Sequence, residues 1–360
     1  MRTPWNILRS ILDIGKSDPS PSGTSGLELA DALLSDLIAR EKVPGLSIKA
    51  LLKGKEWFSG GYGYADLGEQ TGVDPEASIF RIASISKPIT SCALASLVSD
   101  GILDLQEDIR VFVPEFPVSH GRVTLEQLAS HTAGIRSYKG KEFALNKPMS
   151  ISDSLELFIG DPLEFTPGKG YNYTSFDFVL LALAMERAVG KPFHELVLER
   201  VLDPLQMEAT VVENPGAPLA DQVTFYSRTP RGFRESVPVD TRFKLAGGGY
   251  LSTVSDVCRL GLGCLDGRAI PKVLESDFLT AMEVDGTSTF YGLGWEVSSD
   301  AKGRNFYGHT GNAIGAYSNF KVFPKEQLVL GILINASVPE VQPILDAVIE
   351  ALHQSIPPNG

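Results

Sequence analysis

The sequence is poor in the residues that build disulfide frameworks and metal sites. Its 360 residues include three cysteines and five histidines, with no C-x-x-C pair and no H-E-x-x-H motif. Three cysteines are too few for a disulfide framework, so we expect reduced, buried thiols. The scattered histidines offer no ligand set for a metal-activated water. We therefore expect no metal.

Long hydrophobic runs and an excess of positive charge are also absent. The longest apolar runs, 178–185 and 328–334, are far too short to cross a bilayer. A net charge of -12 disfavours nucleic acid or an anionic membrane as the main partner, since both need a basic face. Because 43% of the residues are hydrophobic, a real core is expected. Composition predicts a soluble globular protein, with the cytoplasm as its expected compartment.

Residues 1–15 have an amphipathic pattern, with apolar residues at helical spacing: Trp5, Leu8, Ile11 and Leu12. The pattern fits three alternatives. The segment could be a transit peptide, a helix that contacts a membrane surface or another subunit of a homo-oligomer, or a short helix packed on the protein body. These alternatives stay open, as do mitochondrial, periplasmic and membrane-peripheral locations. Residues 16–26 are rich in Ser, Pro and Gly, which predicts a flexible connector.

Hydrophobic periodicity predicts strands near both ends of the chain and helices between them. Residues 45–52 and 56–64 form one expected hairpin, and 318–323 and 327–335 form another. The expected helices are 27–41, 124–130, 176–189 and 341–354. The predicted fold class is α/β (α+β), in which both chain ends build one antiparallel sheet flanked by helices.

The domain boundaries follow from this arrangement. We expect an N-terminal helix and linker in 1–26, an α/β domain in 27–83 and 245–360, and a mainly helical inserted domain in 84–244. Residues 217–243 have little periodicity and are expected to be irregular.

The segment Ser84-Ile85-Ser86-Lys87 carries the first chemical signal. A serine hydroxyl needs a proton acceptor, and i,i+3 spacing on a helix puts Lys87 on the face that carries Ser84. The apolar residues that follow indicate a buried helix, which would desolvate the lysine and lower its pKa. Taken alone, the segment also fits an N-cap serine followed by a surface lysine.

A second segment, 167–176, places Tyr173 just before a strongly apolar helical pattern. A tyrosine at such a junction reaches a site without being buried in the core. Near two cations its phenol would lose a proton more easily, so we expect a tyrosinate that exchanges protons with a serine and a leaving group. A half-buried structural tyrosine is the alternative for Tyr173, and Tyr171 is a rival for the role.

The third segment, 307–312, precedes a strand-like pattern and ends in glycine-rich turns at Gly311 and Gly315. Small residues let a backbone edge approach a substrate closely. An edge strand also offers unpaired N–H groups, and one that is aimed at a developing oxyanion contributes on the order of 3 kcal/mol. His309 alone would fit an ordinary structural histidine.

Together these segments resemble the serine β-lactamase and penicillin-binding-protein superfamily. Its pattern is S-x-x-K, then Y-x-N or Y-x-S, then K-T-G or H-T-G. Segments 128–135, 167–168 and 246–253 add to the likeness, which covers 42–335. It is greatest to the class C-like branch, and within it to the mitochondrial serine β-lactamase-like proteins, their bacterial relatives and family VIII carboxylesterases. The resemblance implies an antiparallel sheet flanked by helices beside an all-helical domain.

The resemblance also implies roles for single residues. It makes Ser84 the acylated nucleophile, Lys87 the group that takes its proton, and Tyr173 the second acid or base. It also counts His309 among the catalytic residues, where β-lactamases usually carry the lysine of K-T-G, and it places Ser175 where many members have asparagine. The oxyanion hole and substrate-binding positions would be Ser84, Asn312, Ser175, Thr310 and Gly311.

We therefore expect a serine hydrolase that opens an ester or amide through an acyl-enzyme on Ser84 and acts on a small ester, amide or peptide. Such a reaction needs no cofactor. A neutral histidine at 309 would bind a β-lactam carboxylate more weakly than lysine, which favours ester or peptide substrates. The alternatives are a β-lactamase, and a D-Ala-type carboxypeptidase or D-aminopeptidase. A largely non-catalytic binding or scaffold protein on this fold is the alternative from another class.

Overall fold

The computed structural model describes residues 25–357, which fall into two compact units. The larger unit is Glu41–Pro339. The smaller one combines the described parts of Met1–Arg40 and Glu340–Gly360. The predicted amphipathic segment 1–15 and nearly all of the predicted connector lie outside the described residues.

The smaller unit is a pair of helices, α2 (Gly26–Ala39) and α10 (Gln342–Gln354). A capping box starts α2, because the Ser25 side chain accepts from the Glu28 N–H and the Glu28 carboxylate accepts from the Ser25 N–H. The helices meet closely at Gly26, where an added Cβ would lie 2.2 Å from the carbonyl oxygen of Ala351. Both helices were predicted, within two residues at each end.

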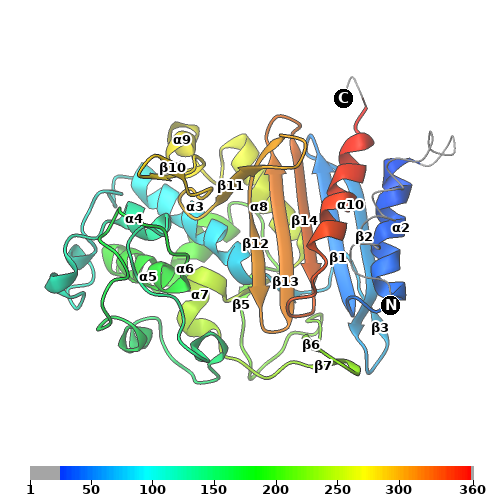
Figure 1. Ribbon diagram of the computed structural model, residues 1–360, viewed down its shortest axis with the longest axis horizontal. Helices are drawn as coiled ribbons and strands as arrows, with labels where there is room; N and C mark the ends of the chain where they lie inside the picture. The colour runs from blue at the N-terminus through cyan, green and yellow to red at the C-terminus, as the bar shows by residue number, and fades with distance from the viewer. Residues whose placement is uncertain (1–24, 358–360) are drawn as a thin grey trace. The chain divides into compact units, whose positions relative to one another are not determined.

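In the larger unit, one antiparallel sheet brings the two ends of the chain together in the order β11-β12-β13-β14-β1-β2-β3 (Figure 1). The central pair joins β1 to β14, with Leu46 opposite Ile334. Both predicted hairpins are confirmed. The strands are β1 (Gly45–Leu52), β2 (Lys55–Asp66), β3 (Thr71–Gly72), β11 (Glu296–Ser299), β12 (Asn305–Ala313), β13 (Ala316–Phe323) and β14 (Leu328–Ile334).

Helix α8 (Val254–Asp266) packs against β1, β13 and β14. The Thr253 side chain caps it by accepting from the Asp256 N–H at 3.2 Å. Gly261 allows the close approach of helix and sheet, since a Cβ there would lie 2.5 Å from Cγ1 of Val329. The absence of a side chain at Gly261 therefore fixes the spacing between α8 and the sheet.

The helices beside the sheet surround α3 (Ser86–Ser99), which is buried along most of its length. Its neighbours include α5 (Ser175–Val189) and α7 (Leu245–Gly248). The other helices of this unit are α4 (Leu125–Ala129), α6 (Phe193–Val197) and α9 (Glu275–Phe278). The boundaries proposed at 84 and 244 stay a prediction.

Several short strands complete the larger unit. They are β4 (Phe80–Arg81), β5 (Val211–Val212), β6 (Tyr226–Thr229), β7 (Gly232–Glu235), β8 (Tyr250–Ser252), β9 (Glu283–Val284) and β10 (Thr287–Ser288). The expectation that 217–243 is irregular was wrong in part, because β6 and β7 pair as a hairpin. Four-residue strands are too short to display a clear alternation, and buried Tyr226 anchors this hairpin through tertiary packing.

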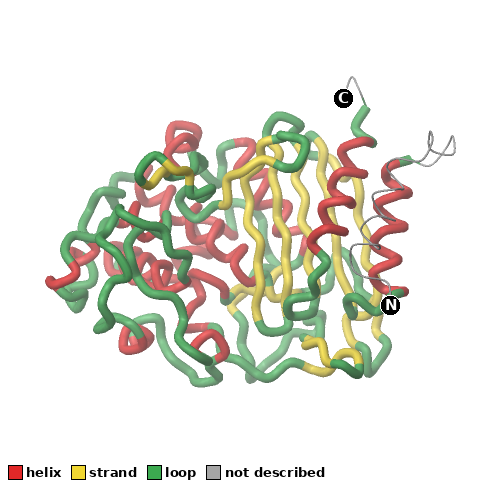
Figure 2. The backbone as a smooth tube through the Cα atoms, in the orientation of Figure 1, coloured by secondary structure: helices red, strands yellow, loops and turns green. Residues whose placement is uncertain are grey.

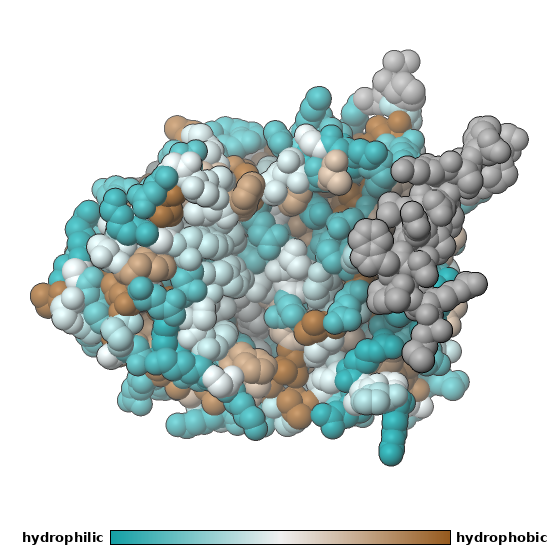
Figure 3. Space-filling model, in the orientation of Figure 1, coloured by the Kyte–Doolittle hydropathy of each residue, from teal (hydrophilic) through white to brown (hydrophobic). Residues whose placement is uncertain are grey.

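Much of the chain between α4 and α5 is loop (Figure 2). The short 3-10 turns Glu142–Ala144 and Asp153–Leu157 interrupt it. On the face in Figure 3, hydrophobic residues form small separate groups among hydrophilic ones, whereas the buried core of the larger unit is one cluster. No helix in the described part of the chain has both the length and the apolar character that a bilayer crossing requires.

Candidate active site

Ser84 lies on a tight turn between β4 and α3. The turn is a 3-10 helix, Ala83–Ile85, and α3 continues from Ser86. Ala83 has φ of 47°, a left-handed conformation that is costly for a residue with a side chain. Ser84 is therefore just outside the α-helix on which the sequence placed it. The i,i+3 relation still holds, because side chains three residues apart align in a 3-10 turn.

A buried ion pair holds this turn against the sheet. Arg81, which precedes the turn in β4, donates to both carboxylate oxygens of Glu213. The same guanidinium donates to the carbonyl of Ile314 at 2.6 Å, in the connection between β12 and β13. Both Arg81 and Glu213 are buried, so the ion pair fixes the guanidinium, and its bond to Ile314 ties the nucleophile turn to the end of β12.

Lys87 is completely buried beside Ser84. Its Nζ lies 3.3 Å from Oγ of Ser84, 3.3 Å from Oγ of Ser175 and 2.8 Å from the carbonyl oxygen of Gly247. Among residues 25–357, no carboxylate forms an ion pair with it. Burial, with a smaller contribution from the positive charge of Lys244, lowers the pKa of Lys87 to about 7. A large share of Lys87 is thus a neutral amine at neutral pH, able to accept a proton.

Tyr173 completes this group from the loop before α5. Its ring centroid lies 4.6 Å from Nζ of Lys87, and its phenol is close enough to Ser84 for that side chain to influence its pKa. Tyr171, the rival, has no such contact with either residue; the two tyrosines are similarly exposed, at 40% and 37%, so the contacts and not the exposure separate them. Burial of the phenol raises the pKa of Tyr173, and the nearby Ser84 side chain opposes this only in part. The expected tyrosinate is thus corrected, because desolvation outweighs the nearby cations and Tyr173 stays protonated.

Strand β12 presents an open edge to Ser84. The third motif lies inside this strand, and neighbouring β11 pairs with it only as far as Gly308. Beyond that point the Thr310 N–H donates to Oε1 of Glu296 at 3.0 Å, so it points away from β13. Alternate N–H groups of a strand point the same way, which directs the Asn312 N–H to this open edge as well. That orientation suits an oxyanion donor.

Gly311 allows β12 to approach the nucleophile turn. A Cβ there would lie 2.2 Å from Oγ of Ser318, 2.7 Å from the carbonyl oxygen of Ile82 and 3.0 Å from Cβ of Ala83. Any other residue would push the strand away from Ser84. The sequence predicted that small residues here let a backbone edge approach a substrate; what the structure shows Gly311 approaching is the nucleophile turn.

His309 lies behind the site. Its Nε2 is 2.9 Å from the hydroxyl of Tyr291, its Nδ1 is 2.7 Å from the carbonyl oxygen of Thr310, and 2% of the residue is exposed. Burial lowers the pKa of His309 to about 4, although the Glu296 carboxylate opposes this. The ring is neutral at pH 7, as the sequence suggested. His309 does not line the pocket beside Ser84.

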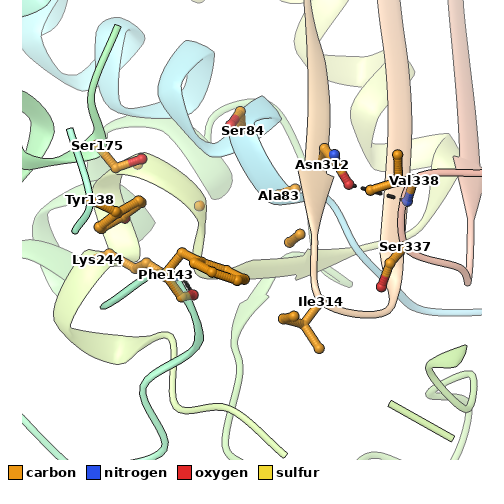
Figure 4. Close-up of a pocket in the computed structure, with 13 residues that line it drawn as sticks. Ala83, Ser84, Tyr138, Phe143, Ser175, Lys244, Asn312, Ile314, Ser337 and Val338 are labelled. Atoms are coloured by element: carbon orange, nitrogen blue, oxygen red, sulfur yellow. Dashed lines mark hydrogen bonds between the residues drawn. The ribbon is translucent and has the colours of Figure 1, made fainter. Parts of the chain in front are cut away.

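A pocket of about 180 Å³ opens beside Ser84. Figure 4 shows Ser84 between Ser175 and Asn312, with one wall from the helical side and the other from the end of the sheet. The helical wall is formed by Tyr138, Phe143 and Lys244, and the opposite wall by Ile314, Ser337 and Val338. The pocket is therefore largely apolar, with one basic group.

Sequence reasoning missed three charged or titratable features of the site. Lys244 donates to the carbonyl of Phe143 at 2.6 Å, and burial lowers its pKa to about 8. The Glu296 carboxylate accepts hydrogen bonds from the backbone N–H and the hydroxyl of Thr310. His131 is fully buried under Tyr173, with ring centroids 4.5 Å apart, and its Nδ1 lies 2.8 Å from Oδ2 of buried Asp177.

The His131–Asp177 pair left a faint signal in the sequence. Asp177 is a single carboxylate at the start of an otherwise apolar helix, and such a residue needs a buried partner. Burial raises the pKa of Asp177 and lowers that of His131, so the pair shares a proton with little net charge. The pair supports the ring of Tyr173, and the Asp177 charge opposes only in part the effect of burial on the pKa of Lys87.

Comparison with known proteins gives one family. The model of the family described as Beta-lactamase matches residues 30–354. Among curated proteins, the chain is 27% identical to the serine beta-lactamase-like protein LACTB, mitochondrial, of Mus musculus, with 95% of this chain and 78% of that protein covered. The resemblance inferred from the three motifs is confirmed.

Solved structures agree at the level of the fold. A D-amino acid amidase from Ochrobactrum anthropi SV3 superposes with a TM-score of 0.81 at 22% identity, covering 91% of this chain and 98% of that one. An octameric penicillin-binding protein homologue from Pyrococcus abyssi gives 0.79 at 23% identity, covering 90% and 76%. At these identities the likeness establishes the shared fold.

Proposed function

The chain belongs to the Beta-lactamase family, and from this premise we propose that it cleaves an ester or amide bond through an acyl-enzyme on Ser84. The observation that carries the proposal is the position of the Lys87 amine. It is fully buried, has no carboxylate partner in the described part of the chain, and lies 3.3 Å from Oγ of Ser84. A lysine in that state is a base matched to neutral pH.

In the acylation step, neutral Lys87 takes the proton of Ser84 as Oγ attacks the substrate carbonyl. The backbone N–H groups of Ser84 and Asn312 would receive the developing oxyanion. As the bond to the leaving group breaks, protonated Tyr173 gives its proton to the departing oxygen or nitrogen. The Lys87 ammonium then returns a proton to the phenolate, so the site recovers its starting protonation state.

In the deacylation step, water adds to the acyl carbon and the bond to Ser84 breaks. Lys87 accepts a proton from this water, and Ser84 regains one as the carboxylic acid leaves. Ser175 is a positioning residue in both steps, because its hydroxyl accepts from the lysine. The resemblance implied that Ser175 contacts the substrate, whereas here we propose that it holds the Lys87 amine in place.

We favour ester or peptide-like amide substrates over β-lactams. Neutral His309 adds no positive charge for the carboxylate of a β-lactam. The amidase with the same fold acts, by its description, on D-amino acid amides, and such amides are accordingly the first to try here. Slow acylation by penicillins stays an expected side activity.

The experiment is mass spectrometry of the intact protein after incubation with a fluorophosphonate or with a penicillin, followed by peptide mapping. An adduct on Ser84 with fluorophosphonate, absent in Ser84→Ala, would support the activated nucleophile. Hydrolysis of a p-nitrophenyl ester should fall by about 10⁴-fold or more in that variant. Full activity in Ser84→Ala would overturn the proposal.

Location and assembly remain predictions. The matched mouse relative is mitochondrial by name, which makes the mitochondrion the first alternative to the cytoplasm. The neighbour from Pyrococcus abyssi is octameric, and a homo-oligomer of this chain would be detected by light scattering across a concentration series. Large assemblies without ester or amide turnover would favour the scaffold alternative.

A further inference from the structure

Glu296 places a negative charge at the edge of the site. The residue begins β11, and its carboxylate accepts from the Thr310 N–H at 3.0 Å and from the Thr310 hydroxyl at 3.2 Å. Its side chain is 35% exposed. Within residues 25–357, neither lysine nor arginine forms an ion pair with it, and the nearest basic atom, Nδ1 of His309, is 3.5 Å away on a neutral ring.

This carboxylate lies at the open edge of β12, where its charge reaches Tyr173. A leaving group must receive a proton, and Tyr173 is the donor in the proposed mechanism. The Tyr173 and His309 rings lie 6.0 Å apart, and His309 in turn approaches Glu296. The pocket with Lys244 lies beside Ser84 without contact to Glu296. The acyl group is expected in that pocket and the leaving group beside Glu296.

We propose that Glu296 selects the leaving group by charge. Carboxylates there are repelled, whereas neutral leaving groups and those that carry an amine are accepted. The inference rests on the proposed function, and it narrows the substrate class to esters and amides whose leaving group is neutral or cationic. It also weighs against penicillins and peptides with a free C-terminal carboxylate beside the cleaved bond, because the hydroxyl of Thr310 is already occupied by a carboxylate of the protein.

A structural role for Glu296 is the competing account. Pairing between β11 and β12 ends at Gly308, so the carboxylate also satisfies a backbone N–H that lacks a strand partner. Glu296→Gln keeps the size of the side chain and an acceptor for this N–H, and removes only the charge. Glu69→Gln is the matched control, because Glu69 is exposed near β3, at the opposite edge of the sheet.

The test uses three phenyl acetates that share an acyl group and carry a para carboxylate, nitro or trimethylammonium substituent. For each ester, kcat/KM of the variant is divided by that of the wild type, which cancels intrinsic reactivity. Glu296→Gln should raise the carboxylate ratio roughly tenfold, lower the ammonium ratio by a similar factor and leave the nitro ratio within about twofold. Glu69→Gln should leave all three ratios near one.

Equal changes in all three ratios, or no change, would overturn the proposal. If Glu296→Gln fails to fold, the wild type still decides the question: added salt should bring the rates of the carboxylate and ammonium esters closer together, and a constant ratio would contradict the charge effect. If instead the proposed function is wrong, fluorophosphonate should fail to label Ser84 in the wild-type protein.

Discussion

Two buried lysines of the larger unit have opposite chemistry. Lys49, in β1, is 8% exposed, and its Nζ lies 2.5 Å from Oε1 of Glu76 and 3.1 Å from Oε2 of Glu56. Burial alone would lower its pKa, but the hydrogen bonds and charges of the two carboxylates outweigh burial and raise the pKa of Lys49. Lys49 therefore stays charged and serves as a structural tie within the sheet.

Lys87 has no such partner. Three uncharged oxygens surround its Nζ, and its pKa falls to about 7. Both lysines are buried, and burial lowers the pKa of each. Lys87 is the more deeply buried of the two, and it lacks the carboxylate partners that keep Lys49 charged.

The largest expected effect comes from removing each amine. Lys87→Met should lower kcat/KM for a p-nitrophenyl ester by roughly 10³-fold or more, because Ser84 loses its proton acceptor. Lys49→Met, which removes a lysine of similar burial, should stay within about threefold of the wild type. Comparable losses of activity in both variants would mean that the substitutions disturb folding and not catalysis. Circular dichroism would detect such a loss of folded structure.

A carboxylate placed beside Lys87 should make this lysine behave like Lys49. Ser175→Asp would place one beside Nζ, and the pocket that Ser175 lines leaves room for it. The pKa of Lys87 should then rise, so activity at pH 7 should fall roughly 10- to 100-fold and recover at higher pH. Ser175→Asn has the same size without charge, and its pH profile should keep the wild-type midpoint. Identical profiles for the two variants would contradict the account.

A smaller effect is expected at Lys244, whose positive charge helps to lower the pKa of Lys87. Activity depends on the neutral amine, so kcat/KM should fall as pH drops below about 7. In Lys244→Met the pKa of Lys87 should rise. The acidic limb of the pH–rate profile, where kcat/KM falls, then moves to higher pH, while the rate at pH 9 stays nearly unchanged. Lys53→Met, in an exposed turn, serves as the control, and an unmoved limb in Lys244→Met would rule out the electrostatic role.

The smallest effects concern stability, and they have opposite signs. Folding lowers the pKa of Lys87 from 10.5 to about 7, so its burial opposes folding fully below pH 7 and less as pH rises from 7 to 10.5. Lys87→Met should thus raise Tm by a few degrees at pH 6 and by less at pH 9. Lys49→Met should lower stability by about 1 kcal/mol, since its partners are largely exposed. Calorimetry of both variants and the wild type at pH 6 and pH 9 measures these changes in Tm and stability.

Local patterns were enough to predict the sheet and the central residues. Strand alternation predicted both hairpins and i,i+3 spacing paired Ser84 with Lys87. The loop-to-helix junction left Tyr171 and Tyr173 as rivals, and the family resemblance selected Tyr173. Each of these signals lies within a few neighbouring residues. Ordered motifs then identified the family, although no single motif was specific enough.

The rest depends on tertiary neighbours that sequence spacing does not reveal. Lys244 and Glu296 come from segments far from Ser84 in the chain. Lys244 lies beside the family-like segment 246–253, but its sequence position assigns it no role, and nothing beside Glu296 marks a site. The pKa of Tyr173 was expected to fall, but the surrounding side chains desolvate the phenol and raise it. Burial of a specific atom is a property of the fold, so its electrostatic consequences could not be derived before the fold was known.

The pKa of Lys87 is the quantity on which the account depends most directly. It is measurable by NMR titration of the lysine side-chain signals in selectively labelled wild-type protein, with Lys87→Met identifying the resonance. We predict one lysine that titrates near pH 7 and whose signal is missing from the variant. A Lys87 signal that titrates near 10.5, the ordinary lysine value, would show that the residue is charged at neutral pH and would contradict its role as the base.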